Sequence, residues 1–412
     1  MHFDEAVEYL FGLGHEILTL KLGLRNTELL LESLDNPQTS YPAVQIAGTN
    51  GKGSTAVMLD SIGRAAGIKT GLYTSPHLVS ITERIRINGE QISEDEFARH
   101  TATVRDAARH LLNTNEIEAL PTFFEHVTAI ALLAFREAGI DLAILETGMG
   151  GRLDSTTAAN ASTVAITQIA MDHEQYLGST IESIASEKAA IIRPGVKAII
   201  GKQGPEALSV LLRRCEDTGV QPILAMPPST PIRIGLRGRH QLENAAIAIA
   251  VAETLSISPE AISSGLETAS HPGRLELISN VLLDGAHNPA GAEALRDYLI
   301  EFGRRPLTIV FGAMSDKQLD RIGELLFPLA DHLILTAIDN PRAASLETLD
   351  TIARRFARRS VTKSKTVADA FQTSLRITPP EGLICVTGSL YLIGEWKREH
   401  GTAKNHQQPK GV

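Results

Sequence analysis

The fold of this chain is decided by residues 44–55, which read VQIAGTNGKGST. Three of the first four residues are apolar and two are β-branched, which is typical of a buried strand, and a glycine-rich turn follows that leads into a helical pattern. Glycines let backbone amides converge on phosphate oxygens, a helix N-terminus adds partial positive charge, and Lys52 supplies a mobile cation. The segment therefore predicts a nucleotide-binding loop between a strand and a helix.

The predicted ATP-binding loop comprises Thr49, Asn50, Gly51, Lys52, Gly53, Ser54 and Thr55. Ser54 or Thr55 can offer a hydroxyl to magnesium. The spacing departs from the strict P-loop, because Gly53 separates Lys52 from the hydroxyl residues and no glycine stands five residues before Gly51. An ordinary glycine turn is the alternative interpretation, but the glycines, lysine and hydroxyls occur together at the junction where a phosphate site requires them.

Outside this loop, short β-branched runs alternate with amphipathic helical patterns, which is typical of βαβ units and a largely parallel sheet. We therefore expect an α/β fold: a P-loop domain with a parallel-rich sheet, followed by a smaller Rossmann-like domain. In the first domain we expect strands at 43–47, 70–73, 142–145, 163–167 and 196–200. Residues 83–87, before an Asn-Gly pair, predict a hairpin arm, and Ser93 with Glu96 predicts a capping box.

Residues 270–274, which read SHPGR, interrupt two helical stretches. We place the domain boundary there, with an ATP-binding domain at 1–272, a C-terminal domain at 273–400 and a flexible tail at 401–412. The C-terminal domain is expected to begin with one strand at 275–283. A helix at 289–302, strands at 307–311, 333–336 and 383–387, and a final helix should follow.

Composition limits the class of protein. The chain has 412 residues, 43% of them hydrophobic, and a net charge of −9, which disfavours a general nucleic-acid binder. Cys215 and Cys385 lie far apart, without neighbours at metal-ligand spacing, so we expect reduced, buried thiols. The N-terminus does not resemble a signal peptide and no long apolar run occurs, so we expect a cytoplasmic protein without membrane partners. The net charge leads us to expect no nucleic-acid partner. A monomer is the default expectation, since the sequence shows no clear dimer patch.

Glu146 follows the apolar run 142–145, at the expected carboxyl end of a parallel strand. α/β proteins place their ligands at that edge, and a carboxylate there suits magnesium. A turn or helix-capping acid is the alternative interpretation for Glu146.

Beyond the loop itself, further segments resemble one family in order along nearly the whole chain. The variant phosphate loop is similar to that shared by Mur ligases and folylpolyglutamate synthases. The segments that resemble the folate branch are YTSPHL at 73–78, ETGMGGRLD at 146–154, DH at 172–173 with LG at 177–178, EKA at 187–189, HQLENA at 240–245, PGR at 272–274 and DGAHNP at 284–289.

The resemblance implies roles for individual residues. The residues expected to bind metal are Ser54, Ser75, Glu146, His173 and Lys188, with Lys188 carbamylated. Those expected to contact ATP, besides the loop, are Asn244, Arg274, Asp284 and His287. Those expected to act in catalysis are Lys52, His173, Lys188, Arg274 and His287. The expected cofactors are ATP as a substrate, two Mg²⁺ ions and K⁺.

The pteroate or folate site is expected to use Phe124, Arg152 and Asp154. Phe124 could stack on the pterin, but Phe123 and Phe124 begin an apolar helix, so one of them is expected in the core. The family usually continues LDATN after the arginine, whereas this chain has LDSTT, with Thr157 in place of the asparagine. This departure concerns the pterin-side contacts and not the ATP chemistry.

The resemblance implies an ATP-dependent amide ligase that adds glutamate to dihydropteroate, to folate or to both through an acyl phosphate. A Mur-type ligase acting on a UDP-muramoyl substrate is one alternative. Mur ligases usually carry an additional N-terminal domain, and only about forty residues precede the loop here, which favours folate. A nucleotide-binding switch that forms no product is the alternative from another class.

Overall fold

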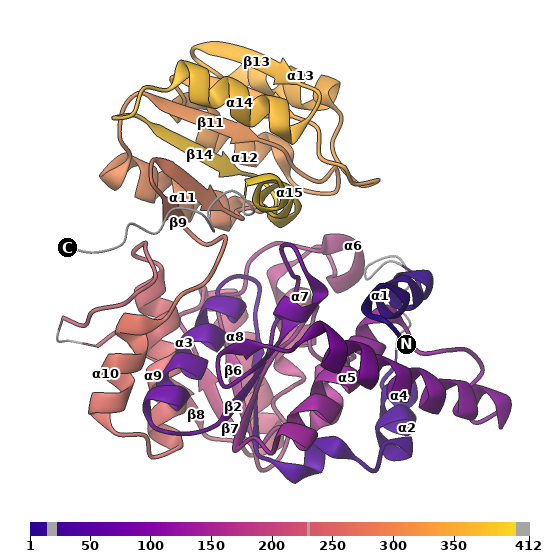
Figure 1. Cartoon of the computed structure of the whole chain (residues 1–412). Coiled ribbons are helices and arrows are strands. Elements are labelled where there is room, and N and C mark those ends of the chain that lie inside the picture. Colours follow the sequence, from indigo (N-terminus) through magenta and orange to yellow (C-terminus); the bar gives the residue numbers. More distant parts are fainter. Residues whose placement is uncertain (15–22, 229–230, 401–412) are drawn as a thin grey trace, which may run out of the picture. The chain divides into compact units, whose positions relative to one another are not determined.

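The computed structural model describes residues 1–14, 23–228 and 231–400, so the predicted tail lies outside the described residues. The chain divides into two compact units, each with its own sheet (Figure 1). The first unit holds residues 1–77, 81–235 and 241–270. The second takes up the chain at His271, against an expected boundary after residue 272, and also includes the short segments 78–80 and 236–240. Nothing in the sequence indicated that these two segments leave the first unit.

In the described part of the first unit, eight strands form a sheet in the order β4-β3-β2-β5-β1-β6-β7-β8. The strands are β1 (Ala43–Ala47), β2 (Thr70–Tyr73), β3 (Ile85–Ile87), β4 (Glu90–Gln91), β5 (Leu142–Glu146), β6 (Thr163–Ile166), β7 (Lys197–Ile200) and β8 (Pro222–Leu224). The strands from β2 to β8 in this order pair in parallel, and β3 and β4 continue the sheet in antiparallel pairs. The loops after β1, β2, β5 and β6 therefore share one edge, where ligands bind in such sheets.

The predicted strands 43–47 and 70–73 are confirmed residue for residue, and those at 142–145, 163–167 and 196–200 differ by one residue at one end. The hairpin prediction is partly wrong. Residues Ile81–Arg84 form a 3₁₀ turn, η2, so the arm begins only at Ile85. The short strand β8 was not predicted, because it begins with proline at the sheet edge and exposes two of its three side chains.

Helices cover both faces of this sheet (Figure 1). They are α1 (Phe3–Gly12), α2 (Arg25–Ser33), α3 (Lys52–Ala65), α4 (Glu94–Asn113), α5 (Phe123–Ala138), α6 (Glu174–Leu177), α7 (Ile181–Ala189), α8 (Pro205–Thr218), α9 (Gln241–Thr254) and α10 (Pro259–Thr268), with 3₁₀ turns η1 (Pro37–Ser40) and η3 (Ser155–Ala159). The predicted capping box of α4 is confirmed: the Ser93 hydroxyl accepts from the Glu96 amide, and the Glu96 carboxylate accepts from the Ser93 amide.

The described part of the second unit has a sheet in the order β13-β12-β11-β14-β10-β9, parallel except for β9. Its strands are β9 (Glu276–Ile278), β10 (Val281–Asp284), β11 (Leu307–Phe311), β12 (His332–Thr336), β13 (Ser360–Ser364) and β14 (Leu383–Thr387). Its helices are α11 (Pro289–Phe302), α12 (Leu319–Leu326), α13 (Leu346–Phe356), α14 (Val367–Ile377) and α15 (Leu390–His400), with the 3₁₀ turn η4 (Phe327–Leu329).

The predicted single strand at 275–283 is wrong, because the chain turns at Ser279, where φ is +57°, and returns as the antiparallel pair β9 and β10. The helix at 289–302 and the strands at 307–311 and 383–387 are confirmed, and β12 begins one residue before the predicted strand. Strand β13 was not predicted, since SVTKS is polar and lies at the sheet edge.

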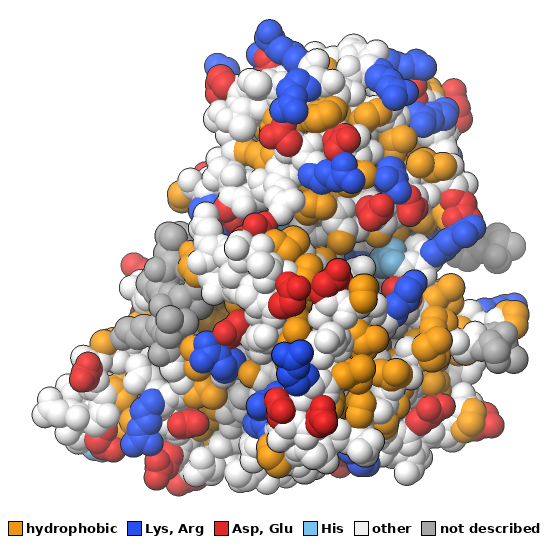
Figure 2. Space-filling model, turned by 180° about the vertical axis from the view of Figure 1, so that it is seen from behind, with side chains coloured by type: hydrophobic (Ala, Val, Ile, Leu, Met, Phe, Trp, Pro, Cys, Tyr) orange, Lys and Arg blue, Asp and Glu red, His pale blue; other side chains and the backbone are white. Residues whose placement is uncertain are grey.

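The molecular surface is chemically mixed. Figure 2 shows acidic and basic side chains interspersed over the face turned to the viewer, without a broad area of one sign. Among the described helices, none combines the length and the apolar character needed to cross a membrane.

Candidate active site

The phosphate loop lies between β1 and α3 and is held by close packing. Gly51 caps α3 with φ at +89°, a left-handed conformation that favours glycine. A Cβ atom on Gly51 would lie 2.1 Å from Oδ1 of Asn244, and one on Gly48 would lie 1.9 Å from Oγ1 of Thr167. Both glycines are therefore required by tertiary packing as well as by backbone conformation. The structure also places Asn244 directly against the loop.

The segment that follows β6 fixes the first half of the loop. The amides of Thr49 and Asn50 both donate to the Gln168 carbonyl, at 2.8 and 3.2 Å. The Thr49 hydroxyl donates to the Ala170 carbonyl and accepts from the Ala170 amide, each at 3.1 Å. Thr49 thus anchors the loop through its backbone and its hydroxyl, and Asn50 through its backbone. Their contact with ATP stays a prediction. The backbone amides best placed for phosphate are those of residues 52–54, at the N-terminus of α3.

The side chains of the loop differ in their surroundings. Lys52 reaches back over the turn, and its Nζ atom lies 3.2 Å from the Thr49 carbonyl oxygen. Ser54 accepts a hydrogen bond from Gln241, at 3.4 Å, and Gln241 in turn accepts one from the Asn244 amide group, at 2.9 Å. Thr55 is fully buried, and its hydroxyl has no hydrogen-bond partner in the described structure. Ser54 is therefore the better positioned of the two hydroxyls for a metal.

Lys188 is buried beside the loop. Its Nζ atom donates to the Gly48 carbonyl at 2.7 Å. Burial, and secondarily the charge of Lys52, lower the pKa of Lys188 to about 7, although the carboxylates of Asp172 and Asp154 oppose this shift. Near neutral pH a substantial fraction of this lysine is a neutral amine. The burial of Lys188 was not predicted from the residue pattern, and no role was predicted for Asp172.

Glu146 and Ser75 come together from neighbouring strands. Glu146 ends β5 and is 5% exposed, and its Oε2 atom accepts from the Ser75 amide at 3.1 Å. His173 lies in the loop after β6, with φ at +51°, and caps the short helix α6. Its backbone amide donates to the Asp172 carboxylate at 2.9 Å. Within the described residues, no three His, Cys, Asp or Glu side chains form a metal-binding group.

A metal ion at this edge would therefore need ligands besides His, Cys, Asp and Glu side chains. The predicted donors Ser54, Ser75 and Glu146 are oxygen ligands of the kind that magnesium takes, usually together with waters and substrate phosphates. Ser54 lies in the first turn of α3, Ser75 in the loop after β2 and Glu146 at the end of β5, all at the same edge of the sheet. The residues at this edge thus fit a divalent cation only in combination with a phosphate-bearing ligand.

The glycine-rich loop after β5 is organised by Asp154. Its carboxylate accepts from the backbone amides of Met149 and Thr156, both at 3.0 Å, and from the Thr156 hydroxyl at 2.6 Å. Thr157 accepts from the Gln45 amide group at 2.8 Å, and its hydroxyl donates to the Gly151 carbonyl at 2.7 Å. Thr157, which replaces the asparagine usual in the family, thus links the loop to β1 by hydrogen bonds. Asp154 shapes the loop, and its contact with pterin stays a prediction.

The two phenylalanines at the start of α5 differ. Phe123 is 2% exposed and lies 5.3 Å below the Arg84 guanidinium, so it belongs to the core. Phe124 is half-buried and packs against Gly148, where an added Cβ would lie 2.5 Å from the phenylalanine ring. Tyr73 lies beside it, with ring centroids 6.0 Å apart. The position of Phe124 next to the loop after β5 is consistent with its predicted role.

In the second unit, the predicted ATP residues lie around the turn after β10. Asp284 is buried, and its carboxylate accepts from the amides of Leu275 and Ala286 at 2.9 and 3.0 Å. Burial raises the pKa of Asp284, while the charge of Arg274 opposes the increase. The Arg274 guanidinium donates to the Gly285 carbonyl at 3.3 Å, and the His287 ring contacts the same oxygen at 2.7 Å. The structure thus groups Arg274, Asp284 and His287 at one turn.

Comparison with known proteins identifies both units. Residues 46–205 match the Mur ligase middle domain, and residues 273–390 match the Mur ligase, glutamate ligase domain. A dihydrofolate synthase/folylpolyglutamate synthase from Bacillus subtilis is 35% identical over 414 residues, covering 92% of this chain and 95% of that protein. A probable bifunctional folylpolyglutamate synthase/dihydropteroate synthase from Halobacterium salinarum is 34% identical over 423 residues. That match covers 96% of this chain, which spans about half of the haloarchaeal protein (51%).

Solved structures agree in fold over nearly the full chain. The Mycobacterium tuberculosis folylpolyglutamate synthase complexed with ADP has a TM-score of 0.90 at 32% identity, covering 99% of both chains. The Escherichia coli FolC complex with DHPP and ADP has a TM-score of 0.87 at 29% identity, covering 98% of this chain and 99% of the other. A bifunctional folylpolyglutamate synthase/dihydrofolate synthase from Yersinia pestis, complexed with AMPPNP and Mn ion, has a TM-score of 0.85 at 29% identity, covering 97% and 98%.

Proposed function

Since this chain belongs to the folylpolyglutamate synthase and dihydrofolate synthase family of Mur ligases, we propose that it joins L-glutamate to dihydropteroate, to folate or to both. The reaction consumes ATP, passes through an acyl phosphate, and releases ADP and phosphate. The observation that carries the proposal is the buried Lys188, hydrogen-bonded to the phosphate loop at Gly48. A buried lysine against a phosphate loop is costly for folding and calls for a functional explanation.

The chemistry matches the residues at the sheet edge. A carboxylate does not react with an amine in water until its oxygen becomes a better leaving group, which transfer of the γ-phosphoryl group provides. This transfer needs positioning and charge neutralisation rather than a covalent enzyme nucleophile. The amides of residues 52–54 would hold the phosphates, and the Lys52 ammonium would offset charge as it develops.

Divalent metal would be held by two groups of donors. Ser54, Ser75 and Glu146 are assigned to the ion at the ATP phosphates, and His173 and Lys188 to a second ion nearer the acceptor carboxylate. The metal supplies neutralisation of phosphate charge when bound. Potassium stays a prediction, for which the residues at this edge provide no separate support.

Lys188 would serve as a ligand only after modification. Its neutral amine attacks the carbon of CO₂ and loses one proton, which leaves a carbamate with one negative charge and two oxygen donors. The lowered pKa of Lys188 favours this reaction, because the amine must be unprotonated to attack. Carbamylation thus converts a buried neutral amine into an anion whose charge Lys52 and a metal can balance.

The remaining substrate contacts follow the same assignment. Phe124 would lie against the pterin ring, while Arg152 and Asp154 would border the acceptor. In the second unit, Arg274 would form forked hydrogen bonds with phosphate oxygens, Asp284 would hold the ribose, and His287 would approach the phosphates.

A product assay tests the proposal. The protein is incubated with ATP, Mg²⁺, labelled glutamate and either dihydropteroate or tetrahydrofolate, and the products are compared by mass. We expect a mass increase of one or more glutamyl units together with release of phosphate. Label incorporation into a UDP-muramoyl acceptor instead would indicate a Mur-type ligase. ATP binding without glutamate-dependent phosphate release would favour a nucleotide switch.

We also propose that the protein acts as a monomer on small molecules alone. The net charge of −9 disfavours nucleic-acid binding, and acidic and basic side chains are interspersed on the face shown in Figure 2. Light scattering at micromolar concentration should give a mass near 44.4 kDa, with or without ATP. A mass near twice this value would contradict the monomer.

A further inference from the structure

The side chain of Gln45 is a buried polar group to which the proposed reaction assigns no role. It projects from the middle of β1 and is fully buried. Its amide nitrogen, Nε2, lies 2.8 Å from the Thr157 hydroxyl, 3.0 Å from the Thr156 hydroxyl and 3.3 Å from the Thr147 hydroxyl. Buried strands of parallel sheets are usually apolar, so an amide at this position requires an explanation.

The hydroxyl protons of two threonines fix the direction of these hydrogen bonds. Thr156 donates its proton to the Asp154 carboxylate at 2.6 Å, and Thr157 donates its own to the Gly151 carbonyl at 2.7 Å. Both hydroxyl oxygens therefore accept from Gln45, so the nitrogen of the Gln45 amide faces them and the oxygen does not. That oxygen is buried without a hydrogen-bond partner in the described structure, which makes the glutamine costly for folding.

Gln45 joins the two ends of the loop after β5. Thr147 directly follows Glu146 at the end of β5, whereas Thr156 and Thr157 lie in η3, where the loop ends. A single side chain on β1 thus bonds to the first residue of the loop and to the turn that closes it. Removal of the amide nitrogen would release both ends at once.

The segment held between these ends lies against two residues of the predicted reaction centre. Gly148 packs against Phe124, where an added Cβ would lie 2.5 Å from the ring. Gly151 packs against α7, where an added Cβ would lie 3.2 Å from the Cα atom of Lys188. Because both contacts are this close, a small shift of the loop would change its distance from the phenylalanine and from the lysine.

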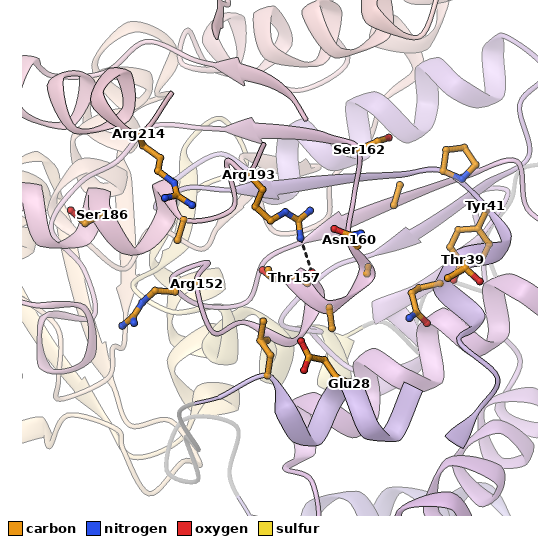
Figure 3. A pocket seen from close by; sticks show the side chains of 17 residues that line it. Glu28, Thr39, Tyr41, Arg152, Thr157, Asn160, Ser162, Ser186, Arg193 and Arg214 are labelled. Carbon is orange, nitrogen blue, oxygen red and sulfur yellow. Dashed lines mark hydrogen bonds between the residues drawn. The ribbon is translucent and has the colours of Figure 1, made fainter. Parts of the chain in front are cut away.

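Thr157 also links the loop to the segment after α7. Its carbonyl accepts from Arg193 at 3.2 Å, drawn as the dashed line in Figure 3, which looks into a groove that both residues line. Arg193 also donates to the Ala161 carbonyl at 2.9 Å, and it lies just after α7, the helix that carries Lys188. The contacts of Thr157 therefore connect β1, the loop and the end of α7.

We propose that Gln45 and Thr157 form a clamp that positions the loop after β5 for the acceptor, so that both act on the reaction through this loop and neither contacts a substrate. The inference rests on the proposed function, which supplies the acceptor. It also accounts for the threonine at 157. The Thr157 hydroxyl donates to Gly151 and accepts from Gln45, and the two polar atoms of an asparagine side chain can do the same. The departure from the family pattern thus preserves the clamp.

Hydrogen exchange tests the clamp without turnover. Gln45→Met keeps the size of the side chain but removes the donor together with the unpartnered oxygen, so the melting temperature should stay within about 3 °C of wild type. The amides of residues 147–157 should exchange about tenfold faster. Thr70→Val is the matched control, because it removes another buried hydrogen bond of the same sheet, from Thr70 to Asp60, at the start of β2. It should leave exchange of the loop unchanged.

Kinetics test the effect on the reaction. In Gln45→Met, KM for the better acceptor, dihydropteroate or tetrahydrofolate, should rise about tenfold. KM for ATP and kcat should stay within threefold, because the segment after β6 holds the phosphate loop instead. Thr70→Val should change none of these constants.

Variants at Thr157 provide a second route to the same test, which also covers a Gln45→Met protein that does not fold. Thr157→Val should raise the acceptor KM as Gln45→Met does, and the double variant should raise it no further, because both changes break one contact. Thr157→Asn keeps a donor and an acceptor, so it should stay within twofold of wild type.

The outcomes separate the clamp from the ligase. Unchanged loop exchange in Gln45→Met, an unchanged acceptor KM in an active Gln45→Met or Thr157→Val protein, or multiplied effects in the double variant would overturn the clamp and leave the ligase intact. Wild type that forms no product with any acceptor would refute the proposed function instead.

Discussion

Lys188 and His126 are two buried bases in the same unit, and burial lowers the pKa of each, to about 7 and about 4 respectively. Their surroundings differ. His126 uses both ring nitrogens inside the fold: one lies 3.0 Å from the Tyr9 hydroxyl and the other 3.1 Å from the Thr122 carbonyl. Lys188 donates to Gly48, and its other hydrogens have no acceptor in the described structure.

The comparison shows that hydrogen bonding, and not burial, distinguishes the structural base from the functional one. Each ring nitrogen of His126 has a hydrogen-bond partner, so the neutral imidazole needs no further ligand. Its bonds stabilise the packing of α1 against α5. A lysine with unused donors stays costly until a ligand or a modification completes its surroundings. Substitution at the sheet edge should therefore affect chemistry, and substitution in the helical layer should affect stability.

The largest effect is expected for Lys52→Ala. Removing the cation from the phosphate loop should lower glutamate-dependent ATP hydrolysis by about 10³-fold, because no other part of the loop supplies a mobile positive charge. Coupled phosphate release measures this loss. The melting temperature should stay within a few degrees of wild type. Lys69→Ala, at an exposed lysine bonded to Ala138, is the control and should retain activity.

Lys188→Ala should lower kcat by about 10²-fold and should leave the free energy of unfolding unchanged or higher, since the cost of burying an amine disappears. Acetate in the buffer should restore part of the activity by occupying the place of the carbamate. A ¹³C resonance at the carbamate position, seen with labelled bicarbonate in wild type and absent in this variant, would give independent support. A folded variant with no rescue and no lost resonance would contradict carbamylation.

His126→Phe keeps a ring in the core but removes both hydrogen bonds. It should cost about 2 kcal/mol in the free energy of unfolding, because the Tyr9 hydroxyl and the Thr122 carbonyl lose a partner. Urea denaturation measures the loss. Its kcat/KM should stay within twofold of wild type. A large loss of activity at unchanged stability would contradict the assignment of His126 to a structural role and of the sheet edge around Lys188 to the chemistry.

The smallest effect is the change in the free energy of unfolding for each unit of pH. The folded pKa of His126 lies below its ordinary value of 6.5, so the stabilisation is complete above pH 6.5 and is lost as pH falls toward 4. Wild type should lose roughly 1 kcal/mol per pH unit in this range relative to His126→Phe. Urea titrations of both proteins at pH 7 and pH 4.5 measure the difference. A constant difference would mean that the pKa of His126 is the same in the folded and unfolded states, which would contradict the shift.

Several elements followed from the sequence because local pattern and tertiary environment agree. The strands at 43–47 and 70–73 are apolar runs in the middle of a sheet, ended by turns. The edge strands Pro222–Leu224 and Ser360–Ser364 were not predicted, because an edge strand needs no apolar face and carries no pattern of its own. Residues 275–283 alternate like one strand, but only backbone geometry reveals the turn at Ser279.

The phosphate loop, Glu146 at a strand end and the α/β class could be assigned from the sequence, because phosphate binding and parallel pairing leave short-range patterns of glycine, charge and β-branched residues. The burial of Lys188, the neighbouring charge of Asp172 and the place of Thr157 under the loop were decided only by the tertiary structure. Burial and electrostatic coupling depend on which distant residues meet, and no local pattern records that.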